Sequence, residues 1–164
     1  MSGRTSPQAV LERYLGTAGA LKLLLNAYPP WLGAGIRVEA IDRDLRCAVV
    51  AMRARWWNRN YVGTHFGGSL YSMCDPMFML LLMQHLPRAQ FEVWDKAATI
   101  RFRRPGRGTV RAVFDVPQTV VDEIVARVPQ PGDRYDAALR TTVNDESGAV
   151  IAEIDKVVYV RRKR

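Results

Sequence analysis

The feature that most constrains the fold is a set of four runs, late in the chain, in which apolar and polar residues alternate. The runs cover 98–103, 110–116, 135–143 and 150–158. Successive residues of a β-strand point to opposite faces of a sheet, so this period of two predicts strands with one face on a core. The last run places Val150, Ala152, Ile154, Lys156 and Val158 on one side. Together the runs predict an antiparallel sheet.

Two earlier strands and three helices complete the expected architecture. The segments are 36–40 and 45–56 for the strands, and 9–28, 67–86 and 119–128 for the helices. A long helix followed by antiparallel strands indicates an α+β fold, in which the helix over 67–86 packs on one face of the sheet. We expect one domain over 1–164, with an N-terminal helical extension over 1–30.

Composition and charge narrow the class of protein. The chain has 164 residues, of which 48% are hydrophobic, so it can bury one core of ordinary size. Its formal net charge of +8 is consistent with simple solubility. It is also consistent with attraction to the phosphates of coenzyme A, to nucleic acid or to a membrane surface. The closing run Arg161-Arg-Lys-Arg164 is expected to form a solvated tail.

The cysteines and the apolar runs indicate a cytoplasmic protein without a metal. Cys47 and Cys74 provide neither a disulfide framework nor a paired metal spacing, although Cys74 is a conceivable thiol nucleophile. The first residues lack the apolar centre of a signal peptide. The run over 70–86 is interrupted by Asp75 and Pro76 and is too short to span a membrane. We therefore expect no membrane association.

The segment from Asn60 to Asp75 contains the best candidates for chemistry. Asp75 is a single acid in an apolar run, and such a carboxylate is costly to ionise unless something supports it, so its pKa is open to perturbation. Gly67 and Gly68 precede a helical run, where backbone can approach a ligand closely and free N–H groups can hold an oxyanion. The segment thus offers an acid, an amide and an electrophilic backbone site.

The Asp75-Pro76 pair allows two interpretations. In the first, the helix begins at Pro76 and Asp75 is only its cap. In the second, the helix begins near Gly68 and Pro76 lies inside it. Pro76 would then remove the hydrogen bond to the carbonyl of Ser72 and kink the helix beside the acid.

The segment Asn60-Tyr-Val-Gly-Thr-His-Phe-Gly-Gly68, with Asp75 beyond it, resembles the hotdog-fold acyl-CoA thioesterases. The similarity is to the phenylacetate-pathway type and to a bacterial branch near it. Those proteins carry N-x-x-G-x-x-H-G-G with an Asp at the eighth position after the first Gly of the pair. Phe66 holds the position of the family's His, and His65 lies one residue early. Thr99-Ile-Arg-Phe-Arg-Arg-Pro-Gly106 resembles a second family strand, which ends in Arg-Pro before a Gly turn.

The resemblance implies a hotdog fold, an antiparallel sheet wrapped around a long central helix, and it favours the second interpretation of Asp75. Such domains form dimers or tetramers through sheet edges, with sites shared between protomers. The family pattern implies that Asp75 is the general base or nucleophile, that Asn60 orients water or the thioester, and that the Gly67 N–H polarises the thioester carbonyl.

Substrate contacts are also implied by the resemblance. They comprise Gly68, His65 and Phe66 beside the helix start, Asp95 and Lys96 ahead of the second matching strand, and Arg103, Arg104 and Arg107 for the coenzyme A phosphates. Taken alone, Asn60 could be a turn residue, Asp95-Lys96 an exposed turn and the arginines an ordinary charged loop.

The predicted function is hydrolysis of an acyl-coenzyme A or acyl-carrier thioester, which requires no cofactor or metal. Two alternatives share the fold: a 3-hydroxyacyl thioester dehydratase, and a catalytically silent domain that binds or senses acyl-coenzyme A. The silent domain is favoured by Phe66 at the position of the family's His. A nucleic-acid-binding module is a further alternative that depends on net charge alone, and the expected partners do not include nucleic acid.

Overall fold

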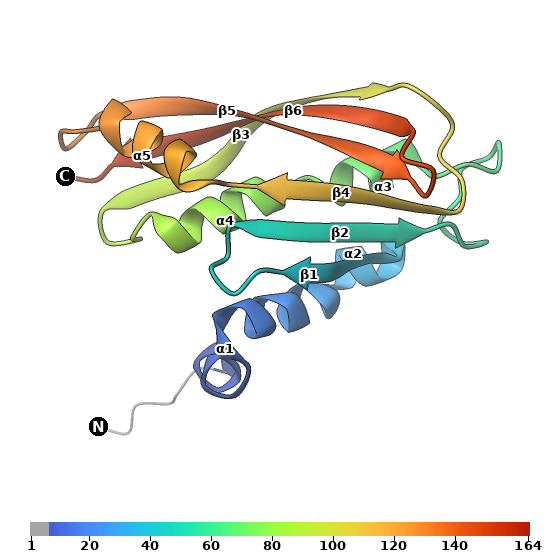
Figure 1. Cartoon of the computed structure of the whole chain (residues 1–164), viewed down its shortest axis with the longest axis horizontal. Helices are drawn as coiled ribbons and strands as arrows, with labels where there is room; N and C mark the ends of the chain where they lie inside the picture. The colour runs from blue at the N-terminus through green and yellow to red at the C-terminus, as the bar shows by residue number, and fades with distance from the viewer. Residues whose placement is uncertain (1–6) are drawn as a thin grey trace.

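A six-stranded antiparallel sheet forms the body of the molecule, with helices against it (Figure 1). The computed structural model describes residues 7–164 and their side chains from residue 16 onward, so the predicted helical contacts of Val10, Leu11 and Leu15 lie outside the described residues. The strand order is β1-β2-β4-β5-β6-β3, which leaves β1 and β3 at the edges. The α+β prediction is therefore confirmed.

The strands follow the alternation in the sequence, with two corrections. They are β1 (Ile36–Ile41), β2 (Cys47–Arg53), β3 (Phe91–Phe102), β4 (Thr109–Asp115), β5 (Arg134–Asp145) and β6 (Val150–Arg162). β6 continues to Arg162, opposite Phe91, so half of the expected basic tail, Arg161 and Arg162, is a strand. β3 begins before Asp95 and Lys96, which are therefore strand residues. A bulge between Asp95 and Ala97 interrupts the period of two there and hides the strand in the sequence.

Five helices accompany the sheet: α1 (Pro7–Asn26), α2 (Pro29–Ala34), α3 (Gly67–Ser72), α4 (Met77–His85) and α5 (Gln118–Arg127). The helices predicted over 9–28 and 119–128 are confirmed. α1 is broken at Gly16, whose φ of 69° belongs to the left-handed region that glycine tolerates. Within residues 7–164, none of these helices has the length and apolarity needed to cross a membrane.

The expected long central helix is in fact two short helices, α3 and α4, because Pro76 interrupts it. Proline has no N–H to donate to the carbonyl of Ser72, four residues earlier. That carbonyl instead accepts a hydrogen bond from the indole Nε1 of Trp31, at 3.2 Å. Each sequence interpretation is partly correct: a helix begins at Gly67, and another begins just after Pro76. Asp75 is not a cap, since no side chain caps α4.

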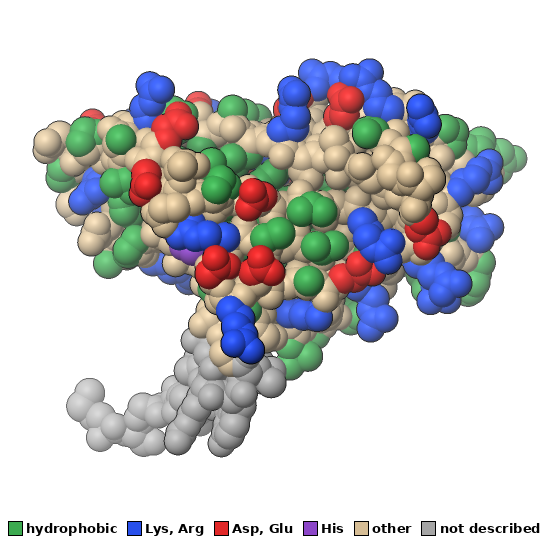
Figure 2. Space-filling model, viewed as in Figure 1, with side chains coloured by type: hydrophobic (Ala, Val, Ile, Leu, Met, Phe, Trp, Pro, Cys, Tyr) green, Lys and Arg blue, Asp and Glu red, His purple; other side chains and the backbone are tan. Residues whose placement is uncertain are grey.

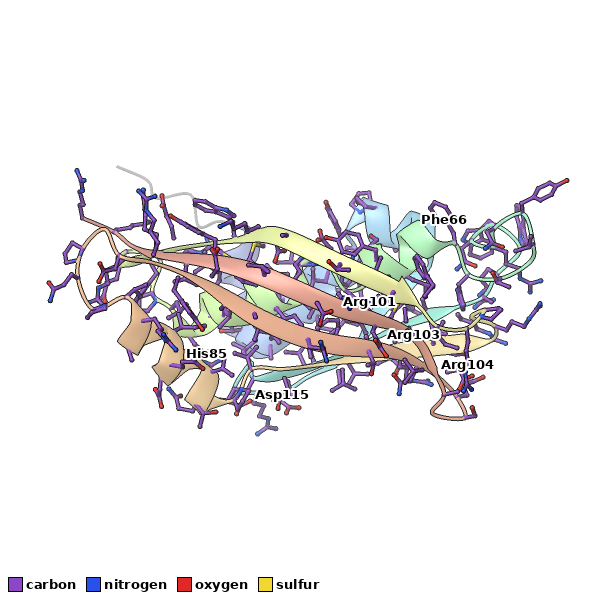
Figure 3. All side chains as sticks on the ribbon, turned by 90° about the horizontal axis from the view of Figure 1, so that it is seen from above. Phe66, His85, Arg101, Arg103, Arg104 and Asp115 are labelled. Atoms are coloured by element: carbon purple, nitrogen blue, oxygen red, sulfur yellow. The ribbon has the colours of Figure 1, made fainter. Side chains whose placement is uncertain are left out.

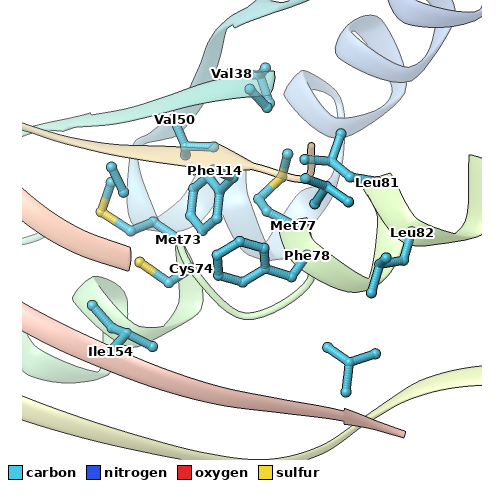
Figure 4. Close-up of a cluster of buried hydrophobic side chains, with 14 of the residues drawn as sticks. Val38, Val50, Met73, Cys74, Met77, Phe78, Leu81, Leu82, Phe114 and Ile154 are labelled. Atoms are coloured by element: carbon cyan, nitrogen blue, oxygen red, sulfur yellow. The ribbon is translucent and has the colours of Figure 1, made fainter. Parts of the chain in front are cut away.

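Both short helices pack their apolar side chains against the inner face of the sheet (Figure 4). Phe78 of α4 meets Phe114 of β4 edge to face, with 5.2 Å between ring centroids. Met73, Cys74 and Met77 are fully buried at the break between the helices. The irregular turn that carries Asp75 is thus fixed on one side by the core.

The hydrogen bond from Trp31 can be tested by Trp31→Phe. Trp31 is 1% exposed, so the substitution leaves the Ser72 carbonyl without its donor and opens a small cavity. We expect the free energy of unfolding to fall by about 2–3 kcal/mol, measured by urea denaturation. Trp57→Phe is the control, because Trp57 is half exposed and its loss should change stability little. Equal effects of the two substitutions would show that the indole bond is unimportant.

Candidate functional site

Most of the predicted site residues fall into two groups that lie apart within one chain. The first group lines a pocket of about 490 Å³, here called the loop pocket, whose walls include Asn60, His65, Gly67, Arg103 and Arg104. The second group surrounds Asp75 at the other end of α3. Asp75 does not line the loop pocket. Gly67 is the first residue of α3, whereas Asp75 follows its last residue, Ser72.

Asn60 shapes the wall of the loop pocket. Its Oδ1 accepts the N–H groups of Val62 at 3.1 Å and Thr64 at 3.0 Å. Its Nδ2 donates to Thr64 Oγ1 at 2.8 Å and to the His65 carbonyl at 3.3 Å. The side chain therefore holds the tight turn that leads into α3. No hydrogen bond of the described residues joins it to Asp75, so the predicted role in orienting water stays a prediction.

His65 is buried and anchors the same loop to the sheet. Its Nε2 lies 3.1 Å from the Gly108 carbonyl, an arrangement that requires Nε2 to carry the proton. Burial lowers the pKa of His65, so the ring is neutral, with the hydrogen bond to Gly108 opposing that shift only in part. Nδ1 is buried and has no partner among the described residues. This geometry fits a structural histidine better than a proton-transfer residue.

The two glycines at the start of α3 leave room for two phenyl rings that lie against them. A Cβ added to Gly68 would lie 2.5 Å from Cε1 of Phe66, and one added to Gly67 would lie 2.8 Å from Cζ of Phe102. Phe66 itself is 56% exposed. A phenyl ring therefore stands where the resembled family has an imidazole, and it covers the backbone of Gly68.

The three arginines predicted to bind phosphate do not form one cluster. Arg103 and Arg104 line the loop pocket, whereas Arg107 does not. Figure 3 shows Arg101, Arg103 and Arg104 following one another at the end of β3. Arg103 donates to Glu153 at 2.7 Å, so part of its charge is already matched. On the face seen in Figure 2, basic side chains are dispersed among acidic ones rather than gathered in one stripe.

Asp75 is supported by two donors that meet the same oxygen. Its Oδ1 accepts a hydrogen bond from Lys156 Nζ at 2.6 Å and one from the Tyr71 hydroxyl at 2.6 Å. Burial opposes ionisation of the carboxyl, but these donors outweigh burial and lower the pKa of Asp75. The Asp75 side chain is 46% exposed. It is therefore an accessible, ionised carboxylate at the break between α3 and α4.

Lys156 joins Asp75 to a second carboxylate. It is 1% exposed, and its Nζ lies 3.3 Å from Asp95 Oδ2. Burial alone would lower the pKa of Lys156, but its two carboxylate neighbours raise it. Burial raises the pKa of Asp95 to about 6, although Lys156 opposes that shift. Asp95 Oδ1 is buried without a partner among the described residues.

The bulge in β3 separates Asp95 from Lys96. Asp95 faces inward to Lys156, whereas Lys96 forms an exposed ion pair with Asp136 at 2.6 Å. Asp95 and Lys96 are both predicted to contact substrate, but they lie in different places. Asp95 belongs to the Asp75 group, whereas Lys96 contacts neither Asp75 nor the loop pocket. The alternative of an exposed turn is wrong for both, since both are in β3.

Sequence analysis missed Lys156 and Tyr71. Lys156 occupies an apolar position in the alternation of β6, and a lysine at such a position requires a buried partner. That irregularity was the available signal. Tyr71 precedes Asp75 by four residues, the spacing at which helical neighbours meet.

Two other chemistries find little support here. Burial raises the pKa of Cys74 to about 12, which removes the thiol nucleophile considered from the sequence. Within the part of the chain that the structure describes, no group of three or more His, Cys, Asp or Glu side chains could hold a metal ion.

Comparison with known proteins places the chain in a family. The model of the family described as a domain of unknown function (DUF4442) matches residues 16–160, so the chain belongs to that family. No curated protein sequence matches the chain at a significant level.

Several solved structures share the fold. A protein of unknown function from Pseudomonas aeruginosa, described as a probable thioesterase, is 22% identical, with 86% of this chain and 93% of that chain covered and a TM-score of 0.76. A thioesterase from Haemophilus influenzae is 14% identical, with 89% and 91% covered and a TM-score of 0.63. A protein of unknown function from Chlorobaculum tepidum is 16% identical, with 99% and 100% covered and a TM-score of 0.68. The fold is thus the hotdog-like fold of thioesterase structures.

The buried ion pair predicts a specific effect of Asp75→Asn on stability. The amide lacks the negative charge that Lys156 requires, so we expect the free energy of unfolding at pH 7 to fall by about 1–2 kcal/mol. The loss should be smaller in a Lys156→Met background, because the partner is then absent. Urea denaturation of wild type, the two single variants and the double variant measures both values.

Asp136→Asn is the matched control for that cycle. Its pair with Lys96 has the same distance of 2.6 Å, but both side chains are about half exposed. An exposed ion pair contributes little, so this variant should change stability by less than about 0.5 kcal/mol. A cycle in which the two substitutions are simply additive would contradict the coupling of Asp75 to Lys156.

Proposed function

We propose that the chain hydrolyses an acyl thioester, with coenzyme A or an acyl carrier protein as the thiol. The observation that carries the proposal is Asp75, an ionised carboxylate that is half exposed at the break between α3 and α4. The fold shared with thioesterase structures agrees with it. A carboxylate and water suffice for hydrolysis of a thioester, and the reaction requires no cofactor.

In the proposed reaction, Asp75 acts at the thioester carbonyl in one of two ways. As a general base, it takes a proton from water while the water oxygen attacks the carbonyl carbon. As a nucleophile, its oxygen attacks the carbon directly and forms an anhydride, which water then hydrolyses. In both cases the C–S bond breaks, the thiolate leaves and takes up a proton, and the Gly67 N–H stabilises the oxyanion.

The proposal requires a second copy of the chain. The loop pocket with Gly67 and the carboxylate of Asp75 lie apart in one chain, so we infer that the pocket of one protomer meets Asp75 of its partner. β3 is an edge strand, and its Trp94 and Phe102 are about half exposed. Continuation of the sheet across this edge would cover both side chains and give a homodimer, or a homotetramer by further association.

Substrate binding is assigned to the loop pocket. We propose that Arg103 and Arg104 bind the phosphates of coenzyme A, because both line the pocket and guanidinium groups bind phosphate in a bidentate manner. Arg107 does not line the pocket and would contact a phosphate only outside it. Leu70 and Phe102 supply apolar walls of this pocket and would contact the thioester arm, whereas Phe66, Gly68 and Lys96 would lie outside it.

A catalytically silent domain that binds acyl-coenzyme A is the second candidate. It is favoured by Phe66, which supplies no proton donor where the resembled family has a histidine. A dehydratase is less well supported, because that reaction would use a histidine beside an acid and His65 is held by Gly108. Assay of thiol release from a series of acyl-coenzyme A substrates separates an enzyme from a binding domain.

Asp75→Asn tests the proposed catalysis. The substitution keeps the size of the side chain but removes the carboxylate, so we expect kcat to fall by roughly 10²–10⁴, with KM changed little. Asp122→Asn is the control, since Asp122 lies on α5 and only accepts a hydrogen bond from Gln118. Wild-type turnover by folded Asp75→Asn protein would sink this mechanism.

Mixing experiments test the shared site. Asp75→Asn and Asn60→Ala should each be nearly inactive, and refolding an equimolar mixture should restore activity in mixed dimers, each of which has one intact site. The double variant refolded with wild type gives no gain and is the control. Light scattering should show a dimer or tetramer at micromolar concentration. A monomer, or a mixture without recovery, would contradict the sharing of residues between protomers.

A further inference from the structure

Lys156 is an unusual residue for its position in the sheet. It lies on the core face of β6 between Ile154 and Val158, both buried, and is itself 1% exposed. A buried ammonium group costs several kcal/mol unless partners compensate it. An apolar side chain at this position would pack without that cost. The lysine therefore calls for an explanation beyond packing.

Lys156 contacts one carboxylate oxygen of Asp75 and leaves the other without a hydrogen bond from the described residues. Lys156 Nζ and the Tyr71 hydroxyl both bond to Oδ1 of Asp75, at 2.6 Å each. No hydrogen bond of the described residues reaches Oδ2, and the side chain is 46% exposed. One carboxylate oxygen is thus fixed by the protein, and the other is available to water or substrate.

Asp95 fixes the lysine in turn. Asp95 Oδ2 lies 3.3 Å from Nζ, and the Tyr71 ring lies on another side, with its centroid 5.4 Å from Nζ. The ammonium group is therefore held between Asp75 at the helix break, Tyr71 on α3 and Asp95 on β3. Three separate elements converge on one buried cation.

We propose that Lys156 is a positioning residue for the thioester hydrolase, holding Asp75 ionised with Oδ2 directed to the reacting carbonyl, while Asp95 holds Lys156. This inference rests on the proposed function. Lys156 does not itself touch substrate, because its nitrogen is enclosed by the protein. It acts through the charge and orientation of Asp75.

The electrostatic consequence has a definite sign. The other titratable groups that face Asp75 and Lys156 are Tyr71, Cys74 and Asp95, and Leu139, the β5 neighbour of Lys156, has no charge. Lys156 is the only cation among these described groups. Without it, Asp75 and Asp95 are two neighbouring carboxylates in a half-buried site, and the pKa of Asp75 must rise.

The test compares pH profiles of Lys156→Met and Asp95→Asn. In wild type, kcat/KM should stay level down to the lowest workable pH, because the pKa of Asp75 is lowered. In Lys156→Met the acid limb should move up by about one pH unit or more, with kcat reduced and KM nearly unchanged. Asp95→Asn removes a like charge, so its acid limb should not move up. A general loss of stability would not move the acid limb in Lys156→Met while leaving it in place in Asp95→Asn.

A second measurement does not depend on activity. The ¹³C chemical shift of the Asp75 carboxyl, assigned by its loss in Asp75→Asn, reports the pKa of this group directly. It should titrate at higher pH in Lys156→Met than in wild type. Lys163→Met is the control: the Nζ of Lys163 donates to the Arg88 carbonyl and not to Asp75, so the titration of Asp75 should be unchanged.

The outcomes separate this inference from the proposed function. Turnover by wild type, with an unshifted acid limb and an unshifted Asp75 titration in Lys156→Met, would overturn the positioning role and leave the hydrolase standing. Absence of turnover with every acyl-coenzyme A and acyl carrier protein thioester tested would overturn the proposed function, and with it the catalytic purpose of Lys156. If Lys156→Met does not fold, Lys156→Gln removes the same charge while keeping a donor, and the same shifts are expected.

Discussion

The contact between Lys156 and Asp75 connects the parts of this structure that matter for function. It joins the core face of β6 to the turn between α3 and α4, at 2.6 Å. The charge of a buried ammonium group must be compensated by nearby carboxylates. Burial of Lys156 on β6 therefore requires that Asp75 and Asp95 lie beside it. The same pairing keeps Asp75 ionised although it is half buried. Packing and the state of the proposed catalytic group are therefore set together.

The position of Asp75 depends in turn on a broken helix. A continuous helix over 67–86 would leave Asp75 within a regular turn and the Ser72 carbonyl bonded to its own helix. Pro76 prevents this, because it has no N–H to donate to the Ser72 carbonyl. The indole Nε1 of Trp31 donates to that carbonyl instead. The irregular turn is fixed by Met73, Cys74 and Met77, which are buried beneath it. An apolar core on one side and a lysine on the other leave only one face of the carboxylate accessible.

The loop that carries Asn60 and His65 and the carboxylate of Asp75 lie in separate parts of the protomer. Asn60 and His65 are occupied in shaping the loop, through bonds to backbone groups nearby and at Gly108. Asp75 lies beyond the opposite end of α3. This separation is the reason for proposing a dimer. Pairing of two protomers at the edge strand β3 would bring the loop of one protomer to Asp75 of its partner.

The sequence by itself determined the order of the strands and the helices α1 and α5, because alternation and helical spacing are local properties that each segment carries alone. It also indicated Asp75 and the effect of Pro76. Only the tertiary structure decided the partners of Asp75, since Lys156 is 81 positions away in the chain. The register of β6 against β3 then places Asp95 close to Lys156. The bulge that turns Asp95 inward breaks the period of two and so conceals its strand. Charges that compensate one another across a core become visible only when the fold has brought them within hydrogen-bonding distance.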